Sequence, residues 1–251
     1  MEYPEFKGRT AIASGAASGM ALLFLQKMAR EGANVVLVDV NAEAVEAEAE
    51  GIRQEGGSAI GVQADIRKYD QIEHAVNLAL AKFGRIDYLM NSAGGNSQRV
   101  CKQSGGFLNA SPESIEWGVD VNLKGAILFV RAVLGKMFEQ NYGVIINMGS
   151  VDGVTGAMGL DYTASKCGMI GLSKGIANYG ASHGVRSVCI SPGPVLTRPA
   201  MANMKTLLGR AAEPREVVDL IMYVCSDKGS FITGCNYMID GGRSCAMGNF
   251  L

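Results

Sequence analysis

The sequence predicts an α/β fold in which a doubly wound parallel sheet carries helices on both faces. Short β-branched runs alternate with longer amphipathic runs, and no composition break or internal repeat marks a linker. Strand–helix alternation gives parallel strands joined by right-handed crossovers, and such sheets are buried on both faces. With 251 residues, 48% of them hydrophobic, the chain can bury one such core. We therefore expect one Rossmann-like domain over residues 1–251.

Five short runs predict the buried strands, and five longer runs with apolar residues at helical spacing predict the helices between them. The expected strands are residues 9–14, 34–39, 86–91, 143–148 and 185–191. The expected helices are residues 20–31, 41–55, 69–83, 113–140 and 161–182. In a sheet of this kind, ligands bind beyond the carboxyl ends of the strands, so the loops after each strand are the candidate site.

Composition and charge exclude several classes of function. The net charge is −1, which leaves no basic surplus for nucleic acid. Runs such as Ala21–Leu25 and Ala126–Val130 are far shorter than the ~20 apolar residues that span a bilayer, and the N-terminus does not resemble a signal peptide. The two histidines, His74 and His183, lie far apart, so we expect no metal site.

The six cysteines form no CxxC pair, which favours a reduced, cytoplasmic protein with thiols packed mostly as small hydrophobic residues. The 33 glycines make up about twice the share that is usual in proteins, which is ~7%, and the chain has only 6 prolines. Glycine in structured turns explains that pattern better than a low-complexity linker does.

The loop after the first strand has the pattern of a dinucleotide-binding turn. Gly15 can turn tightly, and Gly19 allows the backbone to approach a pyrophosphate at the helix N-terminus. The second strand ends in Asp39, about where an acid would accept hydrogen bonds from the adenosine ribose. Since an acid there repels a 2′-phosphate, NAD(H) is favoured over NADP(H).

The loop after the fourth expected strand precedes a possible acid–base pair. Tyr162 and Lys166 are spaced i, i+4 and share one face near the start of a helix. A nearby ammonium and an oxidised nicotinamide would both lower the pKa of a phenol, which is ordinarily about 10, toward a working range. Ser150 could hold the same substrate oxygen. The alternative for Tyr162 and Lys166 is an ordinary surface pair.

Together these segments resemble the short-chain dehydrogenase/reductase family over nearly the whole chain. Ser14-Gly15-x-x-x-Gly19-x-Ala21 is similar to its cofactor loop, Asn91-Ser92-Ala93-Gly94 to its Asn-Asn-Ala-Gly segment, and Pro192–Thr197 to its Pro-Gly-x-Val-x-Thr segment. Asp65 before Ile66, Asn122 in VNLKG and Asp240-Gly241-Gly242 also match family positions. Ala21, in place of a third glycine, departs from the pattern without touching the catalytic set.

The resemblance implies an NAD-dependent enzyme that interconverts a secondary alcohol and a ketone. Tyr162 would be the general acid/base, Lys166 would bind the nicotinamide ribose, and Ser150 would hold the reacting oxygen. Asn122 would hold a water that relays protons. The residues expected to bind NAD are Ser14, Gly15, Ser18, Gly19, Met20, Asp39, Asp65, Ile66, Asn91, Ala93, Gly94, Tyr162, Lys166, Pro192, Gly193, Val195 and Thr197.

Three loops should shape the substrate site: residues 94–112, 150–161 and 194–210. The third loop, which is usually the substrate lid in this family, is short here and favours a bulky or cyclic, hydroxysteroid-like substrate. The polar residues of the first loop instead suit a sugar, polyol or hydroxy acid. Met158, Met201 and Met204 could line an apolar pocket or simply pack the lid. Arg99 and Arg198 could contact an acidic substrate group or be solvated.

Other reactions and assemblies stay open at this point. A 3-oxoacyl-type reductase is an alternative, while retention of Ser150 with Tyr162 and Lys166 argues against enoyl reduction; epimerisation is a further alternative. A cofactor-binding regulator is the alternative outside enzymes. By family analogy we expect a homotetramer, or a homodimer, paired through the helices at about 113–140 and 161–182. Residues 247–251 could pack across a subunit boundary or fray.

Overall fold

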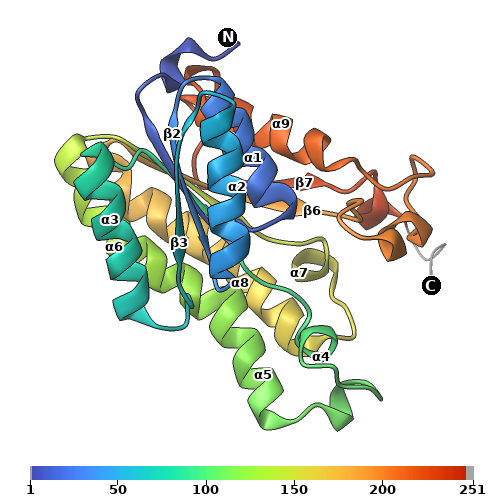
Figure 1. The fold of residues 1–251 in the computed structure, drawn as a ribbon. Coiled ribbons are helices and arrows are strands. Elements are labelled where there is room, and N and C mark those ends of the chain that lie inside the picture. The colour runs from blue at the N-terminus through green and yellow to red at the C-terminus, as the bar shows by residue number, and fades with distance from the viewer. Residues whose placement is uncertain (1, 247–251) are drawn as a thin grey trace.

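Seven strands form one parallel sheet in the computed structural model, which describes residues 2–246 (Figure 1). Their spatial order is β3-β2-β1-β4-β5-β6-β7, and each neighbouring pair is parallel. The strands are β1 (Thr10–Ser14), β2 (Asn34–Asp39), β3 (Ser58–Gln63), β4 (Tyr88–Asn91), β5 (Gly143–Met148), β6 (Val185–Pro192) and β7 (Asn236–Ile239). The order reverses between β1 and β4, where a doubly wound sheet binds ligands. The predicted fold class is confirmed.

Helices cover both faces of the sheet, three long ones on each. One face is covered by α1 (Gly19–Arg30), α2 (Ala42–Gln54) and α9 (Pro214–Cys225). The other is covered by α3 (Tyr69–Phe83), α6 (Gly125–Gln140) and α8 (Leu160–Gly180). Alternation along β2 builds both cores at once, because Val35 and Leu37 pack on the first face while Val36 and Val38 pack on the second.

Shorter helices stand in the loops that follow the strands. After β4 come α4 (Ser97–Val100), η2 (Phe107–Asn109) and α5 (Pro112–Val119), after β5 comes α7 (Asp152–Thr155), and after β6 comes η5 (Pro199–Asn203). Further short 3₁₀ turns are η1 (Pro4–Phe6), η4 (Ala181–His183), η6 (Asp227–Gly229) and η7 (Arg243–Cys245).

The sequence prediction missed two strands and one long helix, and it joined two other helices. The strands β3 and β7 and the helix α9 were not among the predicted elements. The helix expected over residues 113–140 is divided into α5, a π-helical turn (η3, Asp120–Lys124) and α6. Apolar periodicity does not reveal a π turn, because the chain stays helical through it and the flanking helices keep their apolar faces.

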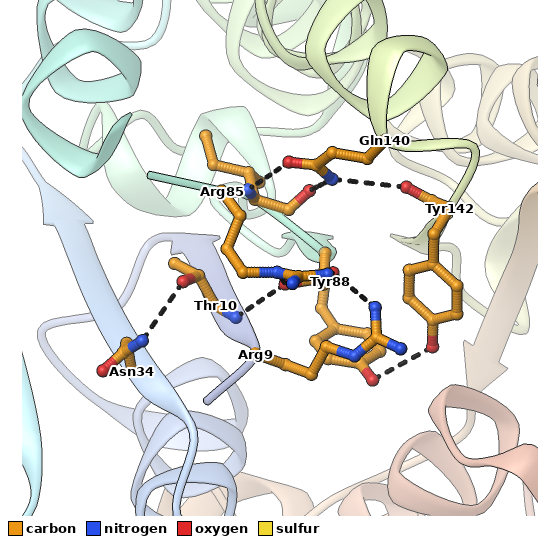
Figure 2. A network of polar contacts seen from close by, with 9 residues as sticks. Arg9, Thr10, Asn34, Arg85, Tyr88, Gln140 and Tyr142 are labelled. Atoms are coloured by element: carbon orange, nitrogen blue, oxygen red, sulfur yellow. Dashed lines mark hydrogen bonds and ion pairs between the residues drawn. The ribbon is translucent and has the colours of Figure 1, made fainter. Parts of the chain in front are cut away.

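A fully paired polar network lies at the amino ends of β1, β4 and β5 (Figure 2). The Asp87 carboxylate has no exposed surface. It accepts hydrogen bonds from the Arg9 guanidinium (2.9 Å), from Nε and Nη2 of Arg85 (2.7 Å each) and from the Thr10 backbone N–H (2.9 Å). The pairing ties the start of β1 to the start of β4, at the edge of the sheet opposite the ligand-binding edge.

Beside this network two phenols meet. The hydroxyls of Tyr88 and Tyr142 lie 3.0 Å apart, and the Arg9 guanidinium lies 4.1 Å from the Tyr142 ring centre. Burial raises the pKa of Tyr88 above the ordinary value, so this phenol stays neutral. At the same end of the sheet, the Gln140 side chain accepts a hydrogen bond from the Ile86 backbone N–H (3.0 Å) and donates one to the Ile86 carbonyl (2.8 Å).

All six cysteines are free thiols. Cys189 and Cys225 are buried and Cys101 is half-buried, but Cys167, Cys235 and Cys245 are exposed. The expectation that most of them pack as core residues is therefore wrong for half of the set. Across residues 2–246, no helix combines the length and apolar character needed to cross a bilayer. Residues 247–251, for which a subunit contact was one expectation, lie outside the described part of the chain.

Candidate active site

A cavity of about 1290 Å³ opens at the carboxyl ends of the strands. Its walls come from the loops after β1 to β6, so residues far apart in the sequence face one space. Crossover connections in a parallel sheet bring these loops to one edge. One side of the cavity holds the glycine loop and Asp39, and the other holds Ser150, Tyr162 and Lys166.

The glycine loop fits the close approach of a dinucleotide backbone. Gly15 has φ +69°, and a Cβ there would lie 2.8 Å from the Cα of Ala93, so only glycine fits that position. Gly19 has φ +65° and begins α1, whose cap residue Ser18 makes no side-chain capping bond. The free N–H groups of that first turn are a ready site for phosphate oxygens. The Ser14 hydroxyl accepts hydrogen bonds from Ser92 and Ala93 N–H (3.2 Å each) and thereby fixes the two loops together.

Two carboxylates stand on the same side of the cavity in different electrostatic states. Asp39 accepts hydrogen bonds from the backbone N–H groups of Ala17 (3.3 Å) and Asn41 (3.1 Å). Asp65 instead forms an ion pair with Arg67 at 2.6 Å, and that guanidinium holds the pKa of Asp65 below its usual range. Of these two carboxylates, Asp39 is therefore the one that has no cationic partner among residues 2–246.

Tyr162 lies in the first turns of α8 and reaches the cavity beside Ser150, the residue that follows β5 and Gly149. Burial raises the pKa of Tyr162, opposed by a hydrogen bond with Ser150 and by the charges of Arg198 and Arg99, while Asp152 raises it further. The chain's own groups therefore do not lower this pKa as the Tyr–Lys spacing predicted. The Lys166 ammonium lies 5.7 Å from the Tyr162 ring centre, but desolvation of the phenol dominates.

Lys166 is one turn further along α8 and is nearly fully buried. Its Nζ donates a hydrogen bond to the carbonyl of Met148, the last residue of β5, at 2.7 Å. Burial lowers the pKa of Lys166 to about 8, because an ammonium is poorly solvated there. The helix α8 and the end of β5 thus hold this amine at the floor of the cavity.

Asn122 lies in the π turn and supports the loop after β4. Its side chain accepts a hydrogen bond from Gly95 N–H (2.9 Å) and donates to the carbonyls of Gly95 (2.9 Å) and Gly118 (2.8 Å). The side chain is buried and does not line the cavity. The π turn supplies this geometry, and π turns occur frequently at functional sites.

The comparisons with known proteins agree with this geometry. A family model described as "Enoyl-(Acyl carrier protein) reductase" (adh_short_C2) matches residues 15–244. The chain belongs to the short-chain dehydrogenase/reductase family. The predicted resemblance is confirmed.

Relatives within the short-chain dehydrogenases carry different names. The chain is 34% identical to "Oxidoreductase UcpA" of Salmonella typhimurium, covering 94% of this chain and 95% of that protein. It is 35% identical to "3-alpha-(or 20-beta)-hydroxysteroid dehydrogenase" of Mycobacterium bovis, covering 94% and 89%. It is 30% identical to "(2S)-[(R)-hydroxy(phenyl)methyl]succinyl-CoA dehydrogenase subunit BbsD" of Thauera aromatica, covering 95% and 97%.

A solved structure of a short-chain type dehydrogenase/reductase from Mycobacterium marinum has the same fold. It superposes with a TM-score of 0.88 at 27% identity and covers 97% of this chain and 98% of that one. The fold of this chain is therefore that of the short-chain dehydrogenases over nearly its whole length.

The cavity brings together most of the residues that the sequence predicts for a short-chain dehydrogenase site. The predicted residues that line it are Gly15, Ser18, Gly19, Met20, Asp39, Asp65, Ile66, Ala93, Gly94, Ser150, Tyr162, Lys166, Pro192, Gly193, Val195 and Thr197. Ser14, Asn91 and Asn122 stand behind the wall. The Asn91 amide donates to the Asn147 side chain at 2.8 Å and joins β4 to β5.

Several lining residues of this dehydrogenase cavity escaped the sequence prediction. Asp152, two residues after Ser150, and Trp117, on α5, both face the cavity. Asp152 lies in the loop after β5, within the expected substrate loop of residues 150–161, and this position was a usable signal. No signal in the sequence marked Trp117, because an aromatic residue on a helix is expected to pack in the core as readily as to line a cavity. Met201 and Met204 line the cavity, whereas Met158 is 86% exposed and does not.

Proposed function

We propose that this chain is an NAD(H)-dependent oxidoreductase that interconverts a secondary alcohol and a ketone. The observation that carries the proposal is the sharing of one cavity by Tyr162, Ser150 and Lys166 with the glycine loop and Asp39. Residues 1–251 would act as a single domain, since the family match runs over residues 15–244.

Each catalytic residue has a role that its surroundings support. The Tyr162 hydroxyl would accept the proton of the alcohol during oxidation and return it to the oxygen during reduction. Ser150, whose hydroxyl lowers the pKa of that phenol, would hold the reacting oxygen beside it. Lys166 would place its amine toward the nicotinamide ribose, and its charge would favour the phenolate. Asn122 would fix the Gly95 backbone and would hold a water that returns protons to solvent.

The residues around the glycine loop fit a nicotinamide dinucleotide. The start of α1 would hold the pyrophosphate, Asp65 and Ile66 the adenine, and Asn91, Ala93 and Gly94 the adenosine side. Pro192, Gly193, Val195 and Thr197 would hold the nicotinamide. The dinucleotide supplies the hydride acceptor or donor, and the chain supplies alignment.

Asp39 supports NAD(H) in preference to NADP(H). Its carboxylate lines the cavity without a cationic partner among the described residues, so it would accept the ribose hydroxyls and repel a 2′-phosphate. Arg67, which also lines the cavity, is occupied by Asp65.

The direct test is a panel of secondary alcohols incubated with NAD and followed at 340 nm. The panel should include hydroxysteroids, polyols and hydroxy acids, because the three substrate loops leave these classes open. We expect NAD-dependent turnover that Tyr162→Phe abolishes while NADH still binds. Tight NADH binding with no turnover of any alcohol or ketone would instead favour a cofactor-binding regulator.

The relatives support the alcohol/ketone reaction more strongly than any one substrate. They include a hydroxysteroid dehydrogenase and a subunit of a hydroxy(phenyl)methylsuccinyl-CoA dehydrogenase, so both a cyclic alcohol and a 3-oxoacyl-type substrate stay candidates. We also propose a cytoplasmic homotetramer, with a homodimer as the alternative, supported by the free thiols and by the family analogy. Light scattering measures the assembly.

A further inference from the structure

Two arginines from different substrate loops face the same part of the cavity. Arg99 belongs to α4, after β4, and Arg198 directly precedes η5, after β6. Both line the cavity that holds Tyr162, and the charge of each lowers the pKa of that phenol. The charge of Arg198 also lowers the pKa of Arg99. The two cations therefore lie near each other and near the reacting end of the cavity.

No carboxylate of residues 2–246 forms an ion pair with either arginine. In that part of the chain, the Arg198 side chain has one weak contact, with the Met201 sulfur at 3.8 Å. Arg67 in the same cavity is different, because Asp65 neutralises it at 2.6 Å. Two like charges held together without an anion between them are unfavourable, and a bound anion would relieve that repulsion.

The carboxylate of Asp152 does not supply that anion. Asp152 also lines the cavity, and burial raises its pKa. The charge of Arg243 opposes this rise in the pKa of Asp152, whereas Arg99 and Arg198 are not among its causes. Burial also lowers the pKa of Arg99, as its first cause, so this guanidinium is partly removed from water.

We propose that the alcohol substrate carries an anionic oxygen group, a carboxylate or a phosphate monoester, that Arg99 and Arg198 bind. The inference rests on the proposed function, since it takes Tyr162 as the end where the carbinol binds. Guanidinium groups suit both anions, because their planar N–H pairs match two oxygens at once. Val100, Trp117, Met201 and Met204 line the cavity as well, so an apolar body between the carbinol and the anion fits.

The experiment compares matched substrates for binding to NADH-loaded enzyme, where no turnover occurs. Trp117 is the only tryptophan of the chain and lines the cavity, so its fluorescence reports occupancy, and calorimetry gives an independent dissociation constant. The first pair is 3-hydroxybutyrate against 3-hydroxybutyramide, and the second is glycerol 3-phosphate against glycerol. In at least one pair, we expect the anion to bind at least about tenfold tighter; the pair identifies the anion.

Variants assign the preference to these two side chains. R99Q and R198Q should each reduce the anion's advantage by about threefold or more, and the double variant should remove it. R30Q is the matched control, because Arg30 lies at the end of α1 and pairs with Glu55 outside the cavity; it should leave the preference unchanged.

Three results would overturn the proposal: equal binding of anion and neutral partner in both pairs, no binding of either anion, or an advantage that survives in the double variant. Failure of the proposed function has a different outcome, namely turnover that persists in Tyr162→Phe or an absence of NADH binding. The two failures are therefore distinguishable.

Discussion

The two edges of the sheet treat buried polar groups in opposite ways. At the amino edge, the Asp87 carboxylate accepts four hydrogen bonds from two arginines and a backbone N–H (Figure 2). At the carboxyl edge, Lys166 is buried with a single carbonyl partner, and its pKa falls to about 8. The comparison teaches that a charged group with a full set of hydrogen bonds, such as Asp87, holds the strands together. A poorly solvated charged group, such as Lys166, lies instead where the chemistry is proposed.

The same contrast appears in two tyrosines, Tyr88, which is buried, and Tyr162, which is half-buried. Burial raises the pKa of both Tyr88 and Tyr162. Tyr88 meets another phenol, that of Tyr142, at 3.0 Å, whereas Tyr162 meets Ser150 and opens into the cavity. Position in the sheet, not residue type, therefore separates a structural phenol from a candidate acid/base.

The largest effect on stability is expected from Asp87→Ala. It leaves two guanidinium groups and the Thr10 N–H without their partner, so the free energy of unfolding should fall by about 3 kcal/mol, as measured by urea denaturation. The kcat of the folded protein should not change. Asp219→Ala is the control, because Asp219 pairs with Lys27 on the surface and is 62% exposed; its loss should cost about 1 kcal/mol or less. Equal losses in the two variants would remove the distinction between the edges.

At the carboxyl edge, Lys166→Met should change how the free energy of unfolding depends on pH. Burial lowers the pKa of Lys166 from 10.5 to about 8. Between these values the unfolded chain holds a proton that the folded chain lacks, so wild-type stability should rise with pH through that window. The stability of Lys166→Met relative to wild type should therefore decline by about 1–3 kcal/mol between pH 7 and pH 10.

Urea denaturation of both proteins at the two pH values measures that difference, and groups common to both cancel. Turnover should also be lost in Lys166→Met. A stability difference that does not change with pH would show that Lys166 is not a poorly solvated charge.

A smaller effect is expected at the cofactor side of the same edge. Asp39→Asn keeps one of the two acceptor oxygens that bind the Ala17 and Asn41 N–H groups and removes the charge, so discrimination against NADP should relax by about tenfold. Asp65→Asn is the matched control, since Arg67 already neutralises that carboxylate. Titrations with NADH and NADPH measure both. An unchanged ratio in Asp39→Asn would contradict the assignment of cofactor preference to this charge.

Much of this architecture was predictable from local pattern. The central strands are buried on both faces and appear as β-branched runs, and the glycine loop and Tyr162–Lys166 spacing lie on the elements expected. The edge strand β3 was missed because Ser58, Gly61 and Gln63 interrupt its apolar run. At the other edge, β7 is only half-buried, which weakens the same signal.

The rest depends on tertiary structure. The π turn around Asn122 depends on the contacts of one amide with Gly95 and Gly118, which no periodicity encodes. Arg99 and Arg198 come from loops after two different strands, so a linear reading treats each as an isolated surface charge. Lys166 and a bound nicotinamide were together expected to lower the pKa of Tyr162, and the spacing to Lys166 contains no information about the desolvation that raises it in the chain alone.

The most direct test compares the phenols of Tyr88 and Tyr162 in parallel. Tyr162→Phe and Tyr88→Phe each remove one hydroxyl, and both variants are measured for alcohol turnover with NAD and for the midpoint of urea unfolding. The account predicts that Tyr162→Phe loses turnover and keeps its stability, while Tyr88→Phe keeps its turnover and unfolds at lower urea concentration. Turnover by Tyr162→Phe at the wild-type rate would contradict the assignment of the proton-transferring group to the carboxyl edge of the sheet.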